Sequence, residues 1–245
     1  MLIRRASALF LLISSIALAT PAALATTANS DATTAKVVNL TRADLPVSTK
    51  WTAAVQTPNT AAEAALGVKA LGCIRASGGV AGKISTDPFG ITEEVGGGVT
   101  ADAQSSDFAE KGSSGVQPSV SSEVVMLKSA TQASNDLSAF ATSVALTCLS
   151  NYLAAGLGVA GTGKVTAATG PPIPRLGTGR GGLDLRFVVT GLGLSGPLVD
   201  DSYFYVQGRA EVYLSFLSIN TQFSKAWSDA IATHVMARAR SVLGS

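Results

Sequence analysis

A strand followed directly by a long helical pattern, in residues 120–157, constrains the fold of this chain more than any other stretch. Val120, Val124, Val125, Met126 and Leu127 are apolar and mostly β-branched, and they predict a buried strand over residues 120–127. Ser129 is the expected N-cap of the helix, because its hydroxyl can accept a hydrogen bond from a free amide of the first turn. The helix is expected to continue to Leu157 with one apolar face, spaced by three or four residues: Leu137, Phe140, Val144, Cys148 and Tyr152.

Only two cysteines occur in the chain, Cys73 and Cys148. In an exported protein two cysteines most simply form one disulfide, and the absence of a Cys-x-x-Cys spacing argues against a redox pair. Cys73 lies in an expected helix over residues 61–75, so the disulfide should connect two helices. The chain-entropy model gives a bridge that closes this 75-residue loop a stabilisation of up to about 4.5 kcal/mol.

The remaining pattern predicts strands and a final helix. Leu185, Phe187 and Val189 alternate with polar or smaller residues and indicate a strand, while residues 203–206 and 210–219 read as an antiparallel hairpin with a turn at 207–209. An apolar face over residues 223–242 predicts the last helix. The predicted fold class is therefore α+β, with one domain over residues 37–245 and an antiparallel sheet flanked by helices.

Three stretches read as irregular. Residues 26–36 are rich in Ala, Thr and Ser and are expected to be disordered, and residues 37–40 to form a short strand. Residues 76–119 and 158–182 are rich in glycine and polar residues and read as long connections, which often form the rims of binding sites.

The first 25 residues have the three parts of a secretory signal. Arg4 and Arg5 precede an apolar run at residues 9–19, and Ala23-Leu24-Ala25 is a small-x-small cleavage site. The run is too short to span a bilayer comfortably. We therefore expect a protein that is secreted or held in the periplasm or cell envelope, without stable membrane insertion once residues 1–25 are removed.

Charge argues against a nucleic-acid partner. Removal of Arg4 and Arg5 lowers the 18 basic residues to 16, which equals the number of acidic ones. A neutral protein has no electrostatic reason to bind nucleic acid or an anionic membrane surface.

No cofactor or metal is expected. Gly158 to Lys164 resembles a phosphate-binding loop but is followed by Val165 instead of Ser or Thr, and it follows a helix. The glycines of residues 191–196 fit a dinucleotide-binding pattern, but a strand and no helix comes after them. One histidine and two bridged cysteines cannot supply the usual zinc ligands.

Two sets of residues are candidates for function. Tyr203 and Tyr205 share one face of a strand, and Tyr213 could join them from the partner strand to form an amphipathic wall of a binding cleft. The alternative is that the three rings only cover the sheet. His234 is the only histidine, so any Ser-His-Asp or Cys-His mechanism would require it; a structural role is the alternative.

Residues 40–46, Leu-Thr-Arg-Ala-Asp-Leu-Pro, followed by Trp51, resemble the opening of exported actinobacterial sensor-like proteins. The Val-Ser-Ser-Glu-Val-Val strand, the helix that ends at Cys148-Leu149, the last hairpin and the last helix extend the resemblance. This family is similar to the extracellular sensor domain of the mycobacterial kinase PknH. The resemblance implies a sheet flanked by helices and a cleft for an undefined ligand. That sensor domain carries a second disulfide, which two cysteines cannot provide.

The sequence therefore favours a non-enzymatic, exported, sensor-like protein that binds an unknown small molecule or an envelope protein. One alternative is a cell-wall-active hydrolase that uses His234. Another is a carrier of an apolar molecule, which the high content of Ala, Leu and Val allows.

Overall fold

A computed structural model describes residues 22–56, 61–84, 98–111, 117–157, 164–170, 173–174 and 182–244. The described residues form one α+β domain, which confirms the predicted fold class. The α-helices are α2 (Ala22–Val38), α3 (Ala61–Ala76), α4 (Ala130–Phe140), α5 (Ser143–Leu157) and α6 (Lys225–Leu243). The predicted signal peptide lies largely outside the described residues.

The centre of the domain is an antiparallel sheet of eight strands. In chain order they are β1 (Trp51–Ala54), β2 (Val99–Gln104), β3 (Asp107–Glu110), β4 (Ser119–Leu127), β5 (Val165–Thr169), β6 (Gly182–Val189), β7 (Leu198–Gln207) and β8 (Ala210–Ile219). The spatial order is β1-β3-β4-β8-β7-β6-β5, and β2 pairs with β4 on the same side as β3. Strands β6 and β7 are longer than the apolar patterns predicted, whereas β8 has the predicted bounds and β4 agrees closely.

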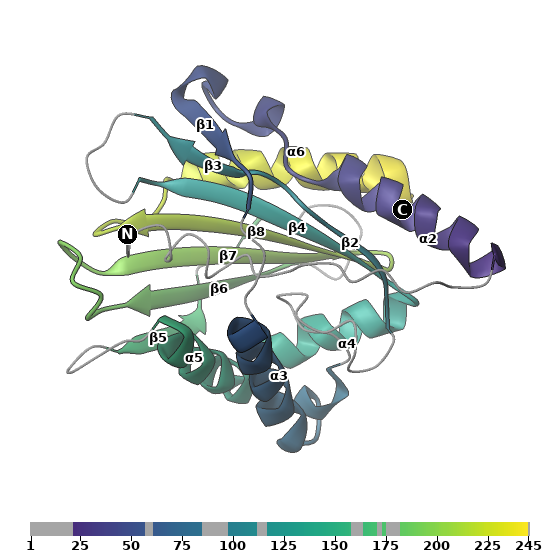
Figure 1. Cartoon of the computed structure of the whole chain (residues 1–245), viewed down its shortest axis with the longest axis horizontal. Coiled ribbons are helices and arrows are strands. Elements are labelled where there is room, and N and C mark those ends of the chain that lie inside the picture. Colours follow the sequence, from purple (N-terminus) through teal and green to yellow (C-terminus); the bar gives the residue numbers. More distant parts are fainter. Residues whose placement is uncertain are drawn as a thin grey trace.

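Helices cover both faces of the sheet. Figure 1 shows α2 and α6 on one face and α3, α4 and α5 on the other. Each face has its own apolar cluster, one built around Trp51, Phe216 and Phe223, the other around Phe140, Phe204 and Leu149. The sheet is thus buried on both sides, and its edge strands β1 and β5 carry the exposed positions.

The single helix expected over residues 130–157 is wrong. Helix α4 ends at Phe140, α5 begins at Ser143, and the two are bent by 78°. The hydroxyl of Thr142 accepts a hydrogen bond from the amide of Ala145, so Thr142 caps a new helix. Val144, which the continuous pattern placed inside, is consequently exposed. Within the described ranges, no single helix is long and apolar enough to cross a membrane; α4 and α5 pass that test only when joined.

The predicted disulfide is confirmed. Cys73 of α3 and Cys148 of α5 are bonded, with their Cα atoms 5.9 Å apart. The bridge joins two helices on the same face of the sheet (Figure 1). Within α3, Ala65 and Val68 are exposed, whereas Leu71 and Ile74 are buried.

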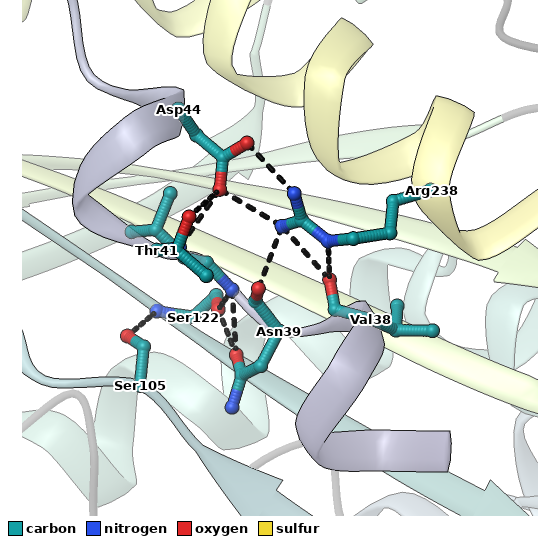
Figure 2. Close-up of polar contacts among 8 residues, drawn as sticks. Val38, Asn39, Thr41, Asp44, Ser105, Ser122 and Arg238 are labelled. Atoms are coloured by element: carbon teal, nitrogen blue, oxygen red, sulfur yellow. Dashed lines mark hydrogen bonds and ion pairs between the residues drawn. The ribbon is translucent and has the colours of Figure 1, made fainter.

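The N-terminal segment is ordered against the last helix. Residues 26–36, expected to be disordered, belong to α2, and Val38 ends that helix instead of forming a strand. Arg238 of α6 donates hydrogen bonds to the main-chain oxygens of Val38 and Asn39 and to both carboxylate oxygens of Asp44, as Figure 2 shows. Burial tends to raise the pKa of Asp44, but the hydrogen bonds from Arg238 and Thr41 outweigh it and hold the pKa below its ordinary value.

The motif at residues 40–46 is therefore structural in this chain. Asp44 accepts a hydrogen bond from the amide of Thr41 and closes a capping box around the short 3-10 helix η1 (Arg42–Asp44). The Trp51 indole donates to the main-chain oxygen of Pro46 at 3.0 Å. Trp51 is fully buried against Phe223 and Trp227. These contacts hold the segment between α2 and β1 on the domain.

The two glycine-rich connections contain strands that the sequence pattern missed. Strands β2 and β3 lie consecutively along one edge of β4, separated by Ser105 and Ser106, and β5 adds the outer strand next to β6. Residues 191–196 form the connection between β6 and β7. The segment 158–163, which resembled a phosphate-binding loop, lies outside the described residues.

Candidate functional site

The three predicted tyrosines lie on opposite faces of the sheet. Tyr203 stands opposite Leu214, and Tyr205 opposite Val212, so both face α6; Tyr213 stands opposite Phe204 and faces α4. Opposed residues of antiparallel strands share a face, and the β7–β8 loop consists of two residues, Gly208 and Arg209. The expectation of one wall formed by all three rings is therefore wrong.

Tyr213 belongs to the other side of the sheet. Its ring stacks on Phe204 with centroids 4.4 Å apart, and its hydroxyl donates a hydrogen bond to Glu211 at 3.1 Å. Burial, with the charge of Glu211, raises the pKa of Tyr213 well above its ordinary value. Its side chain is 8% exposed, so it forms part of the interior packing.

Tyr203 and Tyr205 border a polar cluster between the sheet and the start of α6. Strand β6 contributes Asp184 and Arg186, β7 contributes Asp201, and the first turns of α6 contribute Lys225 and Asp229. The register places Asp184 opposite Tyr203 and Arg186 opposite Asp201, so the side chains from both strands face α6. We call these five charged residues the β6–α6 cluster.

Four of the five charged groups in this cluster are paired. Arg186 Nε lies 2.6 Å from Asp201 Oδ1, and Lys225 Nζ lies 2.7 Å from Asp229 Oδ1. The Lys225–Asp229 pair is partly exposed and spans one turn of α6, so it stabilises the folded protein by only about 0.3–0.5 kcal/mol. Asp201 is buried, so removal of Arg186 would destabilise the protein more than removal of Lys225 would.

Asp184 is the exception. This residue is 3% exposed, and within the described part of the chain neither of its carboxylate oxygens has a hydrogen-bond partner. Burial, followed by the nearby charge of Asp201, raises its pKa to about 7. A buried carboxylate without donors is costly in any protein, which makes this residue the most unusual feature of the described chain.

The tyrosine hydroxyls are engaged elsewhere. Tyr203 Oη is 2.9 Å from Ser228 Oγ and donates to Asp229, while Tyr205 Oη donates to the main-chain oxygen of Pro174 at 3.4 Å. Burial raises the pKa of both hydroxyls, so they stay protonated. The two rings pack edge to face with centroids 6.5 Å apart.

Two glycines allow the backbone to approach the cluster closely. A Cβ atom on Gly170 would lie 1.9 Å from Asp184 Oδ2, and one on Gly182 would lie 2.6 Å from the Tyr205 ring and from Ile173. The amide of Gly170 donates to the main-chain oxygen of Asp184, and not to its carboxylate. Only glycine fits these positions without displacing Asp184 or Tyr205.

Asp200 gives a useful comparison on the other face of the sheet. It is 1% exposed, and burial raises its pKa also to about 7. Its two oxygens, however, accept hydrogen bonds from Ser202 at 3.3 Å and from Ser215 at 3.0 Å. Equal burial therefore produces a satisfied carboxyl group at Asp200 and an unsatisfied one at Asp184.

His234 lies on the exposed side of α6. Among the residues that the structure describes, it makes no hydrogen bond or ion pair with an acid or a nucleophile. The geometry thus supplies no partner for the catalytic role considered above. No group of three or more His, Cys, Asp or Glu side chains in the described ranges could hold a metal ion.

Sequence reasoning missed Asp184 as a site residue. The alternation of β6 does place Asp184 and Arg186 on the face opposite Leu185 and Phe187, a pattern typical of a solvent-exposed face. Nothing local in the sequence indicates that α6, Ile173 and Pro174 cover that face.

Comparisons with known proteins give only distant structural likenesses. No protein-family model matches the chain, and no curated protein sequence matches it. The extracellular domain of PknH from Mycobacterium tuberculosis is similar with a TM-score of 0.35 and 13% sequence identity, over 56% of this chain and 62% of that one. This chain thus spans less than two thirds of that domain. A likeness of this extent does not show a shared family or function, and the family resemblance and actinobacterial origin stay predictions.

Proposed function

We propose that this protein is a non-enzymatic, sensor-like ligand-binding protein of the cell envelope or the secreted fraction. The observation that carries the proposal is Asp184, whose buried carboxylate has no hydrogen-bond donor among the residues that the structure describes, although the four charged groups around it are paired. A buried carboxylate without a donor lowers the stability of the folded protein. If Asp184 served only packing, we would expect another residue at this position or a donor beside it. A bound molecule that donates to Asp184 removes that cost.

The site of this proposal is the β6–α6 cluster with the rings of Tyr203 and Tyr205. It keeps two of the three tyrosines predicted from the sequence and leaves out Tyr213, which lies across the sheet. The two rings supply apolar surface beside Asp184, and the cluster supplies the polar contacts, a combination typical of small-molecule sites.

Export is part of the proposal. The disulfide between Cys73 and Cys148 is the kind of bond that persists in oxidising compartments outside the cytoplasm. The signal-like residues 1–25 point the same way.

Native mass spectrometry of the mature, oxidised protein from the exported fraction tests this function. We expect an added mass that is released on denaturation, and we expect Asp184→Asn to lose it. Asp200→Asn is the matched control, because it neutralises an equally buried carboxyl on the opposite face, and should keep the added mass. A protein with no added mass, and no change on incubation with extracts of the exported fraction, would contradict the proposal.

The hydrolase alternative has its own test. Replacement of His234 by Ala should leave any cell-wall-degrading activity of the preparation unchanged, because its imidazole has no partner among the described residues. The carrier of an apolar molecule stays a prediction without a specific observation in its favour.

A further inference from the structure

The chemistry of the β6–α6 cluster narrows the class of molecule that it could bind, on the basis of the proposed function. Three carboxylates (Asp184, Asp201 and Asp229) face two cations (Arg186 and Lys225). The two ion pairs use both cations, so one negative charge remains, and it lies on Asp184, the buried acid of the three that has no partner within the described residues. A ligand with a single positive charge would make the cluster neutral.

A second buried atom also lacks a partner. Arg186 binds Asp201 through Nε, but its Nη2 atom is buried and donates to no acceptor in the described ranges. Arg186 is two residues from Asp184 on the same strand, so both side chains project from the same face, about 7 Å apart at their Cα atoms. The cluster thus offers one acceptor group that needs a cationic donor and, beside it, one donor that needs an oxygen.

We propose that the β6–α6 cluster binds a compact primary ammonium compound with a neutral oxygen on a neighbouring carbon, with the ammonium on Asp184 and the oxygen on Arg186 Nη2. An ammonium group has three donors, enough to satisfy both oxygens of Asp184. The oxygen is neutral because a carboxylate there would restore the excess negative charge. A divalent metal fits poorly, since the described residues offer no group of three ligating side chains.

The rings of Tyr203 and Tyr205 favour the same class of ligand. Lys225 Nζ already lies 5.8 Å from the centroid of the Tyr203 ring, so the negative ring face contributes to a site for positive charge. The hydroxyls of both tyrosines are occupied, as described above, and do not compete for Asp184. The close approach of Gly170 limits the space and excludes bulky substituents on the ammonium.

Ethanolamine is the simplest probe of this class, and three compounds isolate its parts. Ethylamine lacks the oxygen, ethylene glycol lacks the charge, and glycine replaces the neutral oxygen by a carboxylate. Titration of the mature protein, followed by the NMR shifts of the Gly170 and Gly182 amides, reports binding at the site itself. We expect affinity to fall in the order ethanolamine, ethylamine, glycine, with no binding of ethylene glycol.

Variants assign each contact. Asp184→Asn should weaken the binding of ethanolamine at least about thirtyfold, because a buried charge pair is lost. Arg186→Lys keeps the charge that pairs with Asp201 but removes Nη2, so it should make ethanolamine bind no better than ethylamine. Asp200→Asn should leave all affinities unchanged.

The pH profile gives a further readout. Ethanolamine binding should weaken as the pH falls through about 7, because protonation of Asp184 removes its charge. The other titratable and charged groups that face Asp184 are Arg186 on its own strand, Asp201, Tyr203 and Tyr205 on β7, and Lys225 and Asp229 on α6. In the Asp184→Asn variant, the remaining binding of ethanolamine should not weaken as the pH falls through about 7.

The outcomes separate this inference from the proposed function. Equal binding of ethanolamine by the wild type and by Asp184→Asn, or no binding by either, overturns the ligand class. An added mass in the native spectrum that depends on Asp184 but belongs to a neutral or anionic molecule would also overturn it, while the proposed function would stand.

Discussion

Replacement of Asp184 by Asn should change how the stability of the protein depends on pH. The two side chains have nearly the same shape, but Asn does not ionise. The pKa of Asp184 is about 7 in the folded protein and its ordinary value is 3.8. The folded protein therefore keeps this proton at pH values at which the unfolded chain has lost it, so stability falls as the pH rises from about 4 to about 7 and then levels off.

The magnitude follows from the two pKa values. Between about pH 5 and about pH 8, Asp184 alone should lower the free energy of unfolding of the wild type by about 2.5 kcal/mol. Asp200 has a similarly raised pKa, but it is present in both proteins, and its contribution cancels in the comparison. The free energy of unfolding of the variant, relative to that of the wild type, should therefore rise by about 2.5 kcal/mol over this pH interval.

Urea denaturation of both oxidised proteins at a series of pH values measures the effect. The difference in the free energy of unfolding should be small at the acid end and grow until about pH 7. Parallel curves for the two proteins would show that Asp184 does not hold a proton in the folded state, and would refute the reasoning. Addition of a saturating cation that binds Asp184 should reduce the difference, because it stabilises only the wild type.

Three further predictions concern stability and can be measured by chemical denaturation. Replacement of Cys73 and Cys148 by Ser should lower the free energy of unfolding by up to about 4.5 kcal/mol, and an equal loss on adding reductant to the wild type would identify the bond as the cause. Arg238→Ala should cost about 3 kcal/mol, because it leaves Asp44 buried without its cation; Arg240→Ala, two residues further along α6, is the control and should cost less than about 0.5 kcal/mol. Gly170→Ala should destabilise by about 1–3 kcal/mol through its overlap with the Asp184 carboxylate, whereas Gly72→Ala, with open space around it in α3, should be neutral or stabilising by up to about 1 kcal/mol.

The parts of the fold that depend on local pattern could be predicted from the sequence. Strand β4, the hairpin of β7 and β8, helix α6 and the Cys73–Cys148 bond follow from alternation, helical spacing and the cysteine count. In β8, Val212, Leu214 and Phe216 belong to one apolar cluster, as the alternation of the strand requires.

The missed elements depend on partners distant in the sequence. Strands β2, β3 and β5 are short and carry polar or small residues, and they are strands because β4 and β6 offer them hydrogen bonds. The break between α4 and α5 did have a local signal, since Thr142 followed by Ser143 can cap a new helix, but the apolar spacing on either side concealed it.

The parts of the candidate site that depend on local alternation could be predicted, and the parts that depend on distant segments could not. Tyr203 and Tyr205 share a face by alternation alone, but the face of Tyr213 depends on the length of the β7–β8 loop, and a difference of one residue moves a side chain across the sheet. The role of Asp184 depends on what covers β6, which no local pattern encodes.

The contacts of Arg238 have a kinetic consequence. This residue of the last helix bonds to Val38 and Asp44, which are 200 and 194 residues earlier in the chain. Contacts of such separation close nearly the longest loops that the chain allows, and high contact order slows folding because the closure entropy is lost before the contacts form. The central pairing of β4 with β8 spans a long loop as well. A growing chain cannot pair β4 with β8 until residues 210–219 are available, and it cannot fix its N-terminal segment until Arg238 of α6 is available, so folding should be late and cooperative.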